Sequence, residues 1–172
     1  MIQLTVATPD EMESLGALVA ARLGAGDLVL LNGELGAGKT TLTRGLGARL
    51  GVRGAVTSPT FVLARTHPRE TGAPLVHVDA FRLGSAVELD DLDIDFERSI
   101  VVVEWGAGLL DGLTENWLEV DIVRPTGGRS TGPELETTSV PAPVDGPEPR
   151  IVTFTGHGER WKDLGWVGAA RD

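Results

Sequence analysis

The chain has 172 residues, the usual size of one domain, and a formal net charge of −10. This acidity disfavours a free-standing nucleic-acid binder, because contacts to phosphates dominate the affinity of such proteins. The absence of cysteine excludes disulfides, thiolate zinc sites and cysteine nucleophiles. No apolar run is long enough for a transmembrane helix, and the first residues lack the pattern of a secretory signal, so we expect a cytoplasmic protein with no membrane contact.

The apolar pattern predicts strands that alternate with helices. A strand at residues 2–6 precedes a helix whose start is marked by a capping box at Thr8 and Glu11. A buried strand at 27–32 then leads into a glycine-rich loop and a second helix. Further elements are expected as strands at residues 60–65, 75–78, 100–103, 117–123 and 151–155 and as helices at 86–92 and 157–164. This alternation predicts a single α/β domain with a central mixed, mostly parallel sheet flanked by helices and with antiparallel strands late in the chain.

Residues 124–150 break this pattern. The stretch is rich in Pro, Gly, Ser and Thr and has few apolar residues. Such a composition cannot bury enough apolar surface to form a core, so we expect a long, mobile loop or insertion there. The sequence does not suggest a role for it.

The glycine-rich loop GELGAGKT at residues 33–40 fits the pattern G-x-x-x-x-G-K-[ST]. Its glycines let successive backbone N–H groups face phosphates, beside the positive end of the following helix. Lys39 is expected to span the β- and γ-phosphates of ATP, and the Thr40 hydroxyl to bind Mg²⁺. The cradle itself is expected to be built from Gly33, Gly36, Ala37 and Gly38. An ordinary glycine-rich turn is the alternative, and the flanking strand and helix patterns disfavour it.

A second metal contact is expected from Glu104, which directly follows the apolar run at 100–103. A carboxylate at the end of a strand beside the loop can reach the metal held by Thr40. The alternative is that Glu104 is only the first solvated residue after a buried strand.

Two further segments fit the same site. Thr60 follows the loop helix where nucleotide switches place a hydroxyl facing the γ-phosphate, although the segment also suits a turn that starts a strand. Asp79 and Arg82 lie three residues apart at a strand end. Asp79 is expected to hold the water shell of the metal or orient an attacking water, and Arg82 to offset γ-phosphate charge. A surface ion pair between them is the plainer alternative.

Four motifs, GELGAGKTTLTRGLG, SPTF, HVDAFRL and VVVEW, resemble in their order and spacing the TsaE family, formerly YjeE. These are small bacterial ATPases of tRNA threonylcarbamoyladenosine synthesis. The resemblance covers nearly all of residues 1–123 and includes the late segment TFTGHGERW. Two departures are Phe81, where the family usually has tyrosine, and Gly106, where proline is common.

The resemblance implies a role for each matching residue. The phosphate cradle would span 36–41 and so include Thr41, with Thr40 and Glu104 on Mg²⁺. Thr60 and Asp79 would be switch and catalytic-site residues. Trp105 would neighbour the nucleotide, and the helix start around Glu11 would lie near the base.

The resemblance also implies a P-loop NTPase-like domain over residues 1–172. It would be a Mg²⁺-dependent ATPase that docks on the threonylcarbamoyl transferase subunit and its paired non-catalytic subunit, meeting tRNA only indirectly. A non-hydrolysing nucleotide switch and a small-molecule kinase are the alternatives, and the kinase lacks a visible arginine-rich lid. ATP is favoured over GTP because no Asn-Lys-x-Asp stretch is present. His67, His77 and His157 lack the spacing of a zinc site and are interpreted as structural or surface residues.

Overall fold

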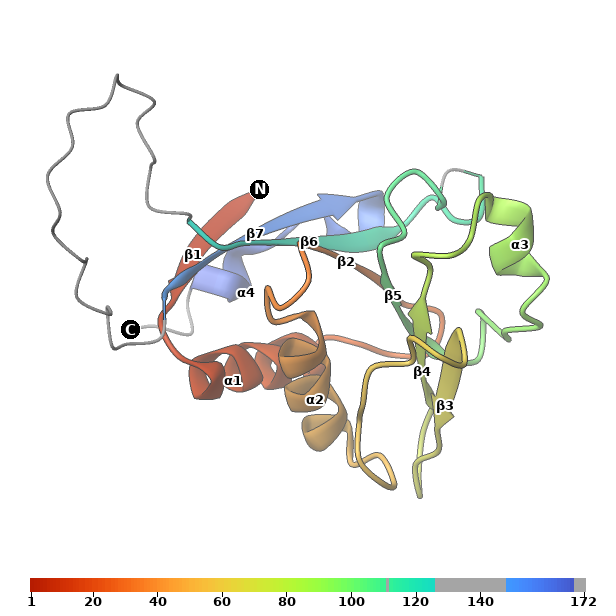
Figure 1. Ribbon diagram of the computed structural model, residues 1–172. Helices are drawn as coiled ribbons and strands as arrows, with labels where there is room; N and C mark the ends of the chain where they lie inside the picture. Colours follow the sequence, from red (N-terminus) through yellow and green to blue (C-terminus); the bar gives the residue numbers. More distant parts are fainter. Residues whose placement is uncertain (111, 126–147, 169–172) are drawn as a thin grey trace, which may run out of the picture.

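The strands form one seven-stranded sheet in the order β1-β7-β6-β2-β5-β4-β3 (Figure 1). The computed structural model describes residues 1–110, 112–125 and 148–168. The strands are β1 (Ile2–Val6), β2 (Leu28–Asn32), β3 (Ala64–His67), β4 (Leu75–Asp79), β5 (Ile100–Glu104), β6 (Trp117–Val123) and β7 (Arg150–His157). The helices are α1 (Pro9–Ala20), α2 (Lys39–Leu50), α3 (Ala86–Asp90), the 3₁₀ turn η1 (Glu159–Trp161) and α4 (Gly165–Gly168).

The centre of the sheet is parallel and its borders are antiparallel. Strand β2 pairs in parallel with β5 and β6, and β4 pairs in parallel with β5. Strands β1, β7 and β3 are antiparallel to their neighbours. The α/β class and the mixed sheet are therefore confirmed, with antiparallel pairing at β3 as well as late in the chain. Because the central strands are parallel, the carboxyl ends of β2, β4 and β5 meet at one edge of the sheet.

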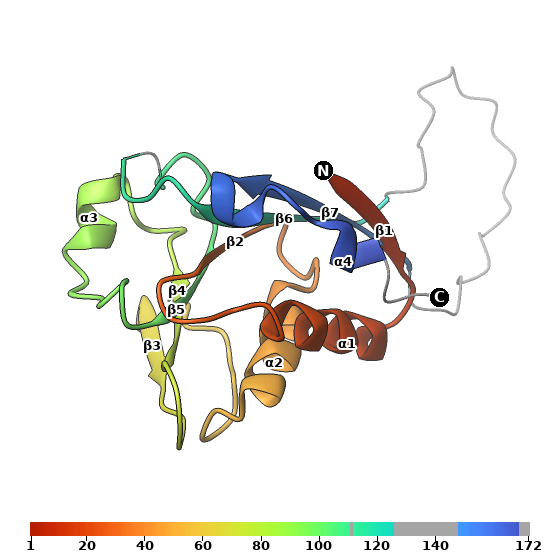
Figure 2. The ribbon, with the colours of Figure 1, turned by 180° about the vertical axis from the view of Figure 1, so that it is seen from behind.

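Strands β2, β4 and β5 are buried on both faces, and their alternate residues belong to two separate cores. One core lies between the sheet and helices α1, α2 and α4, and it contains Leu31 and Val102. The other lies beneath α3 and the loops around it, and it contains Leu30 and Val103. Figures 1 and 2 show α1 and α2 side by side on one face, with α3 at the opposite end of the sheet. Within the described ranges, no helix has the length and apolarity needed to cross a membrane.

The expected elements differ from the structure in two places. The strand expected at 60–65 begins only at Ala64, because the N–H groups of Val62 and Leu63 both donate to the carbonyl of Pro59 and fold this segment into a turn. Of the helix expected at 157–164, only the 3₁₀ turn η1 forms, and α4 begins just after the expected range. Strand β7 continues to His157, and Gly158 at φ 75° ends it. Of the stretch at 124–150, residues 126–147 lie outside the described residues.

Helices α1 and α2 pack so closely that glycine is required at their crossing. A Cβ on Gly45 would lie 1.9 Å from the carbonyl oxygen of Glu13, and one on Gly16 would lie 2.0 Å from that of Leu42. Gly45→Ala is therefore expected to lower the free energy of unfolding by about 2 kcal/mol or more, because backbone cannot yield as a side chain can. Alanine's better helix propensity, worth about 1 kcal/mol, offsets only part of this.

Urea denaturation measures the effect, with Gly24→Ala as the control because a Cβ there would meet no atom within 4 Å. Equal midpoints for the wild type and Gly45→Ala would contradict the close packing of the two helices.

Candidate nucleotide-binding site

Residues from four separate segments surround one cavity of about 220 Å³ at the carboxyl edge of the parallel strands. The segments are the glycine-rich loop with the first turn of α2, the turn before β3, the end of β4 and the end of β5. The lining residues are Leu35, Gly36, Gly38, Lys39, Thr40, Thr41, Ser58, Thr60, Asp79, Glu104 and Trp105. Most of the predicted site residues are thus brought together.

The loop adopts a conformation that depends on its glycines. Gly36 has φ 77° and Gly38 has φ 120°, in the region that L side chains avoid. Gly38 is the N-cap of α2 and provides no side-chain hydrogen bond to the first turn. The N–H groups of that turn are therefore available to an anion, and the helix dipole favours negative charge at this end.

Lys39 is buried at the centre of the loop. Its Nζ donates to the carbonyl oxygens of Gly33 at 2.6 Å and Glu34 at 3.1 Å, and lies 4.1 Å from the ring centroid of Trp105. Burial lowers the pKa of Lys39, against the opposing effect of the negative charges on Glu104, Asp79 and Glu34. Within the described ranges the hydrogen bonds of this ammonium go to carbonyl oxygens, so an anion at the loop would add a stronger, charge-assisted partner. Gly33 does not line the cavity, but its carbonyl accepts the hydrogen bond that holds Lys39 in the loop.

Two buried carboxylates end adjacent strands beside the loop. Asp79 and Glu104 are paired in the register of β4 and β5, and both are at most 6% exposed. The Thr40 hydroxyl donates to Glu104 Oε1 at 3.5 Å, and Asp79 Oδ1 accepts the N–H of Phe81 at 3.0 Å. Hydroxyl and carboxylate oxygens are the ligands that Mg²⁺ prefers, so Thr40 and Glu104 suit a magnesium site.

His77 is a member of this site that the sequence interpretation missed. It is fully buried on β4, and its Nε2 lies 2.7 Å from Glu104 Oε1. Of the two settings that the sequence left open, structural or surface, the structure gives His77 the buried one, in contact with the expected metal ligand. Its position two residues before Asp79 was the available signal, since alternate residues of a strand share a face.

Thr60 lines the cavity, whereas Arg82 does not. The Thr60 hydroxyl lies 2.7 Å from that of Ser58. Arg82 is exposed, and its guanidinium donates to the backbone carbonyl of Thr60. The structure therefore joins Arg82 to the turn before β3 rather than to Asp79, its partner in the surface-pair alternative.

A second cavity, of about 160 Å³, lies on the other side of the loop. It shares Gly36, Gly38 and Thr41 with the first cavity, and it also contains Ala37. The start of α1 lines it through Thr8, Pro9 and Met12. The two cavities together flank the loop, with the first beside the carboxylates and the second beside α1.

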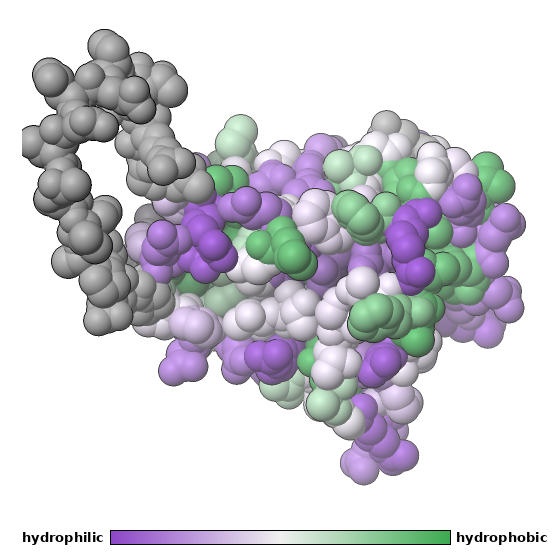
Figure 3. Space-filling view, viewed as in Figure 1, coloured by the Kyte–Doolittle hydropathy of each residue, from purple (hydrophilic) through white to green (hydrophobic). Residues whose placement is uncertain are grey.

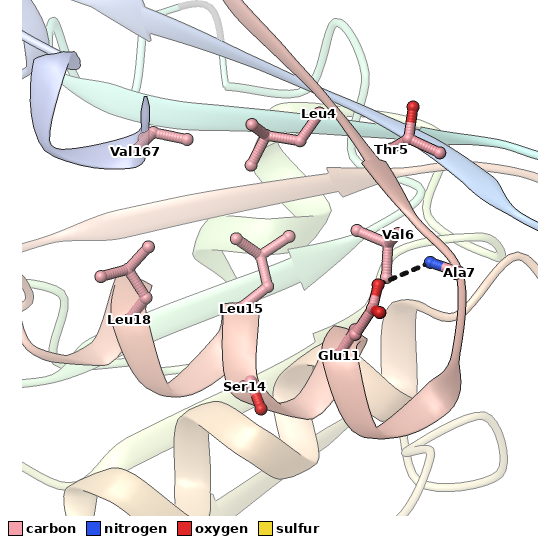
Figure 4. A pocket seen from close by; sticks show the side chains of 9 residues that line it. All are labelled: Leu4, Thr5, Val6, Ala7, Glu11, Ser14, Leu15, Leu18 and Val167. Atoms are coloured by element: carbon pink, nitrogen blue, oxygen red, sulfur yellow. Dashed lines mark hydrogen bonds between the residues drawn. The ribbon is translucent and has the colours of Figure 1, made fainter. Parts of the chain in front are cut away.

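Glu11 is not brought to either of these cavities. Its carboxylate accepts the N–H of Ala7 at 2.7 Å and so completes the capping box at the start of α1. It faces a larger, mainly apolar cavity of about 550 Å³ between β1, α1 and α4 (Figure 4). The residues of the helix start that line the cavity beside the loop are Thr8, Pro9 and Met12.

Two arginines contact the loop from the ends of β6 and β7. Arg124 Nη2 donates to the carbonyl of Gly36 at 3.2 Å, and Arg150 Nε donates to that of Ala37 at 3.1 Å. Arg124 also lies 3.6 Å from Glu148. Sequence patterns did not indicate these contacts, because both arginines border the stretch that reads as a loop.

This arrangement defines the class of the protein. A glycine-rich loop between a central parallel strand and a helix, with acidic residues ending the adjacent strands, is the architecture of a P-loop α/β protein. A family model described as "Threonylcarbamoyl adenosine biosynthesis protein TsaE" matches residues 6–131. The chain belongs to the TsaE family.

Individual relatives agree with this assignment. A protein of Streptomyces coelicolor named tRNA threonylcarbamoyladenosine biosynthesis protein TsaE is 54% identical over 154 residues, which cover 87% of this chain and 93% of that protein. The Bacillus subtilis protein of the same name is 31% identical, with 91% and 86% covered. A crystal structure of Bacillus subtilis YdiB superposes with a TM-score of 0.70 at 26% identity, covering 99% of this chain and 96% of that one.

Trp105 is placed to report on the site. It lines the cavity beside Lys39, and its ring meets that of Phe81 edge to face at 5.4 Å. We expect Mg²⁺-ATP to change the tryptophan emission of the wild type, because indole emission responds to nearby charge, and expect Trp105→Phe to lose that change. A fluorescence titration of both proteins measures it. A nucleotide-dependent change that survives intact in Trp105→Phe would assign the response to another tryptophan.

Proposed function

We propose that this protein is a Mg²⁺-dependent ATPase of the cytoplasm that is required for forming the threonylcarbamoyl group on adenosine of tRNAs. The observation that carries the proposal is the meeting of Lys39, Thr40, Asp79 and Glu104 at one cavity. Membership of the TsaE family supports the pathway, since its relatives are named for tRNA threonylcarbamoyladenosine biosynthesis.

Each residue has a role in this proposal. Lys39 and the N–H groups of the first turn of α2 bind the β- and γ-phosphates. Thr40 and Glu104 hold Mg²⁺, which supplies charge neutralisation between the two phosphates when bound. Asp79 orients the attacking water. Thr60, which lines the same cavity, contacts the γ-phosphate in the ATP-bound state in this proposal. The cavity of about 160 Å³ beside α1 adjoins the loop, and we propose that the nucleoside side of ATP binds there.

Partner docking is proposed through a rim of exposed apolar residues around the first cavity. Leu35 is 89% exposed, Phe61 94% and Phe81 69%, and each belongs to a loop that borders the cavity. Figure 3 shows apolar surface in patches between polar ones on this face of the molecule. Exposed aromatic and aliphatic side chains are typical of protein interfaces, whereas a chain of net charge −10 repels a phosphate backbone. We propose that the threonylcarbamoyl transferase subunit and its paired non-catalytic subunit bind here, and that tRNA is met only through them.

Phosphate release from ATP, with and without these two subunits, tests the proposal. We expect slow release by the protein alone and faster release with the subunits, while bare tRNA binds weakly. Phe61→Ser should lose the stimulation and keep the basal rate, whereas Val87→Ser, an equally apolar and 67% exposed position on α3, should keep both. Nucleotide-dependent subunit binding without phosphate release would favour the switch alternative. Tight binding of bare tRNA to this chain alone would contradict the docking proposal.

A further inference from the structure

We infer that His77 is a positioning residue that holds the Glu104 carboxylate in the orientation needed to bind Mg²⁺. The inference rests on the proposed function and adds a residue to it. His77 Nε2 lies 2.7 Å from Glu104 Oε1, and the two side chains are 0% and 5% exposed. The Thr40 hydroxyl reaches the same oxygen only at 3.5 Å, so the imidazole makes the shorter contact.

The direction of this hydrogen bond follows from the chemistry of its partners. An ionised carboxylate has only acceptors, so the proton of the bond belongs to His77 Nε2. His77 Nδ1 is buried and, among the described residues, has no hydrogen-bond partner. The tautomer with its proton on Nε2 donates to Glu104 and leaves a lone pair, rather than an unpaired N–H, on the buried Nδ1.

Glu104 needs such a donor because of its neighbours. Its carboxylate is buried next to that of Asp79 across the β4–β5 pair, and two like charges in one site repel each other. The hydrogen bond from His77 fixes one oxygen and restricts rotation of the carboxylate. Partners of this kind orient metal ligands, and their loss typically reduces metal affinity about 10- to 100-fold.

The same chain contains a similar pair away from the cavity, which provides a matched control. His157 Nε2 lies 2.7 Å from Glu119 Oε2, between strands β7 and β6. Neither residue lines the cavity that contains Glu104. Breaking this second pair removes a histidine–glutamate hydrogen bond of the same length without touching the expected metal ligand.

The test measures nucleotide affinity by calorimetry on the full chain, across a range of Mg²⁺ concentrations and in excess EDTA. In His77→Leu we expect the Mg²⁺ concentration for half-maximal enhancement of ATP binding to rise about 10- to 100-fold, with affinity in EDTA unchanged. His77→Gln, whose amide N–H₂ reaches about as far as Nε2, should restore most of the wild-type dependence. His157→Leu should match the wild type.

Several results would overturn the inference. They are an unchanged Mg²⁺ dependence in His77→Leu, an equal loss of affinity with and without Mg²⁺, or a failure of His77→Gln to recover. If His77→Leu does not fold, His77→Asn replaces it, because its amide is too short to reach Glu104. If nucleotide binding by the wild type did not depend on Mg²⁺, the proposed function itself would be overturned. This result is distinguishable from a failure of the role of His77 alone, in which the wild type retains its Mg²⁺ dependence.

Discussion

Lys39→Ala is expected to weaken ATP binding about 100-fold or more and to abolish measurable hydrolysis. Two charge-assisted hydrogen bonds to the β- and γ-phosphates are lost, each worth about 1.5–3 kcal/mol, and about 2.8 kcal/mol corresponds to a factor of 100 in Kd. The other lysine of the chain, Lys162, is exposed and paired with Glu159 at 2.5 Å, so no second ammonium can replace Lys39. Calorimetry for Kd and a phosphate-release assay for turnover measure the two effects.

The same variant should fold as well as the wild type. Burial lowers the pKa of Lys39, which means that the folded protein bears a cost for keeping the ammonium charged at neutral pH. Removing the side chain removes that cost together with its two hydrogen bonds to loop carbonyls, so the thermal midpoint should change little. Lys162→Ala is the control and should retain wild-type binding and turnover. A folded Lys39→Ala protein that hydrolyses ATP at the wild-type rate would disprove the site assignment.

Glu104→Gln and Asp79→Asn are expected to reduce kcat about 100-fold while changing the nucleotide Kd, measured at saturating Mg²⁺, much less. Both substitutions keep the shape of the side chain and remove its charge. Groups that act on the metal or its waters contribute most in the transition state, where removing one electrostatic contact costs about 100-fold in rate. Steady-state kinetics combined with direct Kd measurements separates the two quantities.

Glu119→Gln is the matched control for these variants. Glu119 is, like Glu104, a glutamate on a parallel strand that contacts a histidine at 2.7 Å, but it does not line the cavity. Its kcat should stay near that of the wild type. If both Glu104→Gln and Asp79→Asn turned over at the wild-type rate, the role of these two carboxylates in ATP hydrolysis would be disproved.

The sequence predicted the parts of the site that depend on local pattern. The loop at 33–40 has a fixed spacing because its backbone must turn around a phosphate, and Glu104 follows a run of apolar residues that reads plainly as a buried strand. The structure brings Lys39, Thr40 and Glu104 together as this reasoning expected. These residues meet because β2 and β5 pair in parallel, which places the ends of both strands at the same edge of the sheet. Their proximity therefore depends on the strand topology rather than on the local sequence.

The contacts of His77 and Arg82, which the sequence did not predict, are non-local. His77 meets Glu104 across two strands that are distant in the chain, and a single histidine on an apolar strand carries no spacing signal. Arg82 donates to the backbone of Thr60, which no side-chain pattern can reveal. The resemblance implied that the helix start around Glu11 lies near the base, and the structure adds that the Glu11 carboxylate accepts the N–H of Ala7 in the capping box.

Arg124 and Arg150 donate to carbonyls of the glycine-rich loop. Because of these contacts, the geometry of the loop does not depend on the length of the chain that connects β6 to β7. Strands β6 and β7 are paired from Trp117 with His157 to Val123 with Ile151, so the chain leaves and re-enters the sheet at adjacent points. Arg124, just after β6, and Arg150, at the start of β7, both donate to carbonyls of the glycine-rich loop. Closing a connection twice as long costs only about 0.6 kcal/mol more in chain entropy. Changes in length or composition confined to residues 126–147 are therefore expected to leave the contacts of Arg124 and Arg150 with the loop in place.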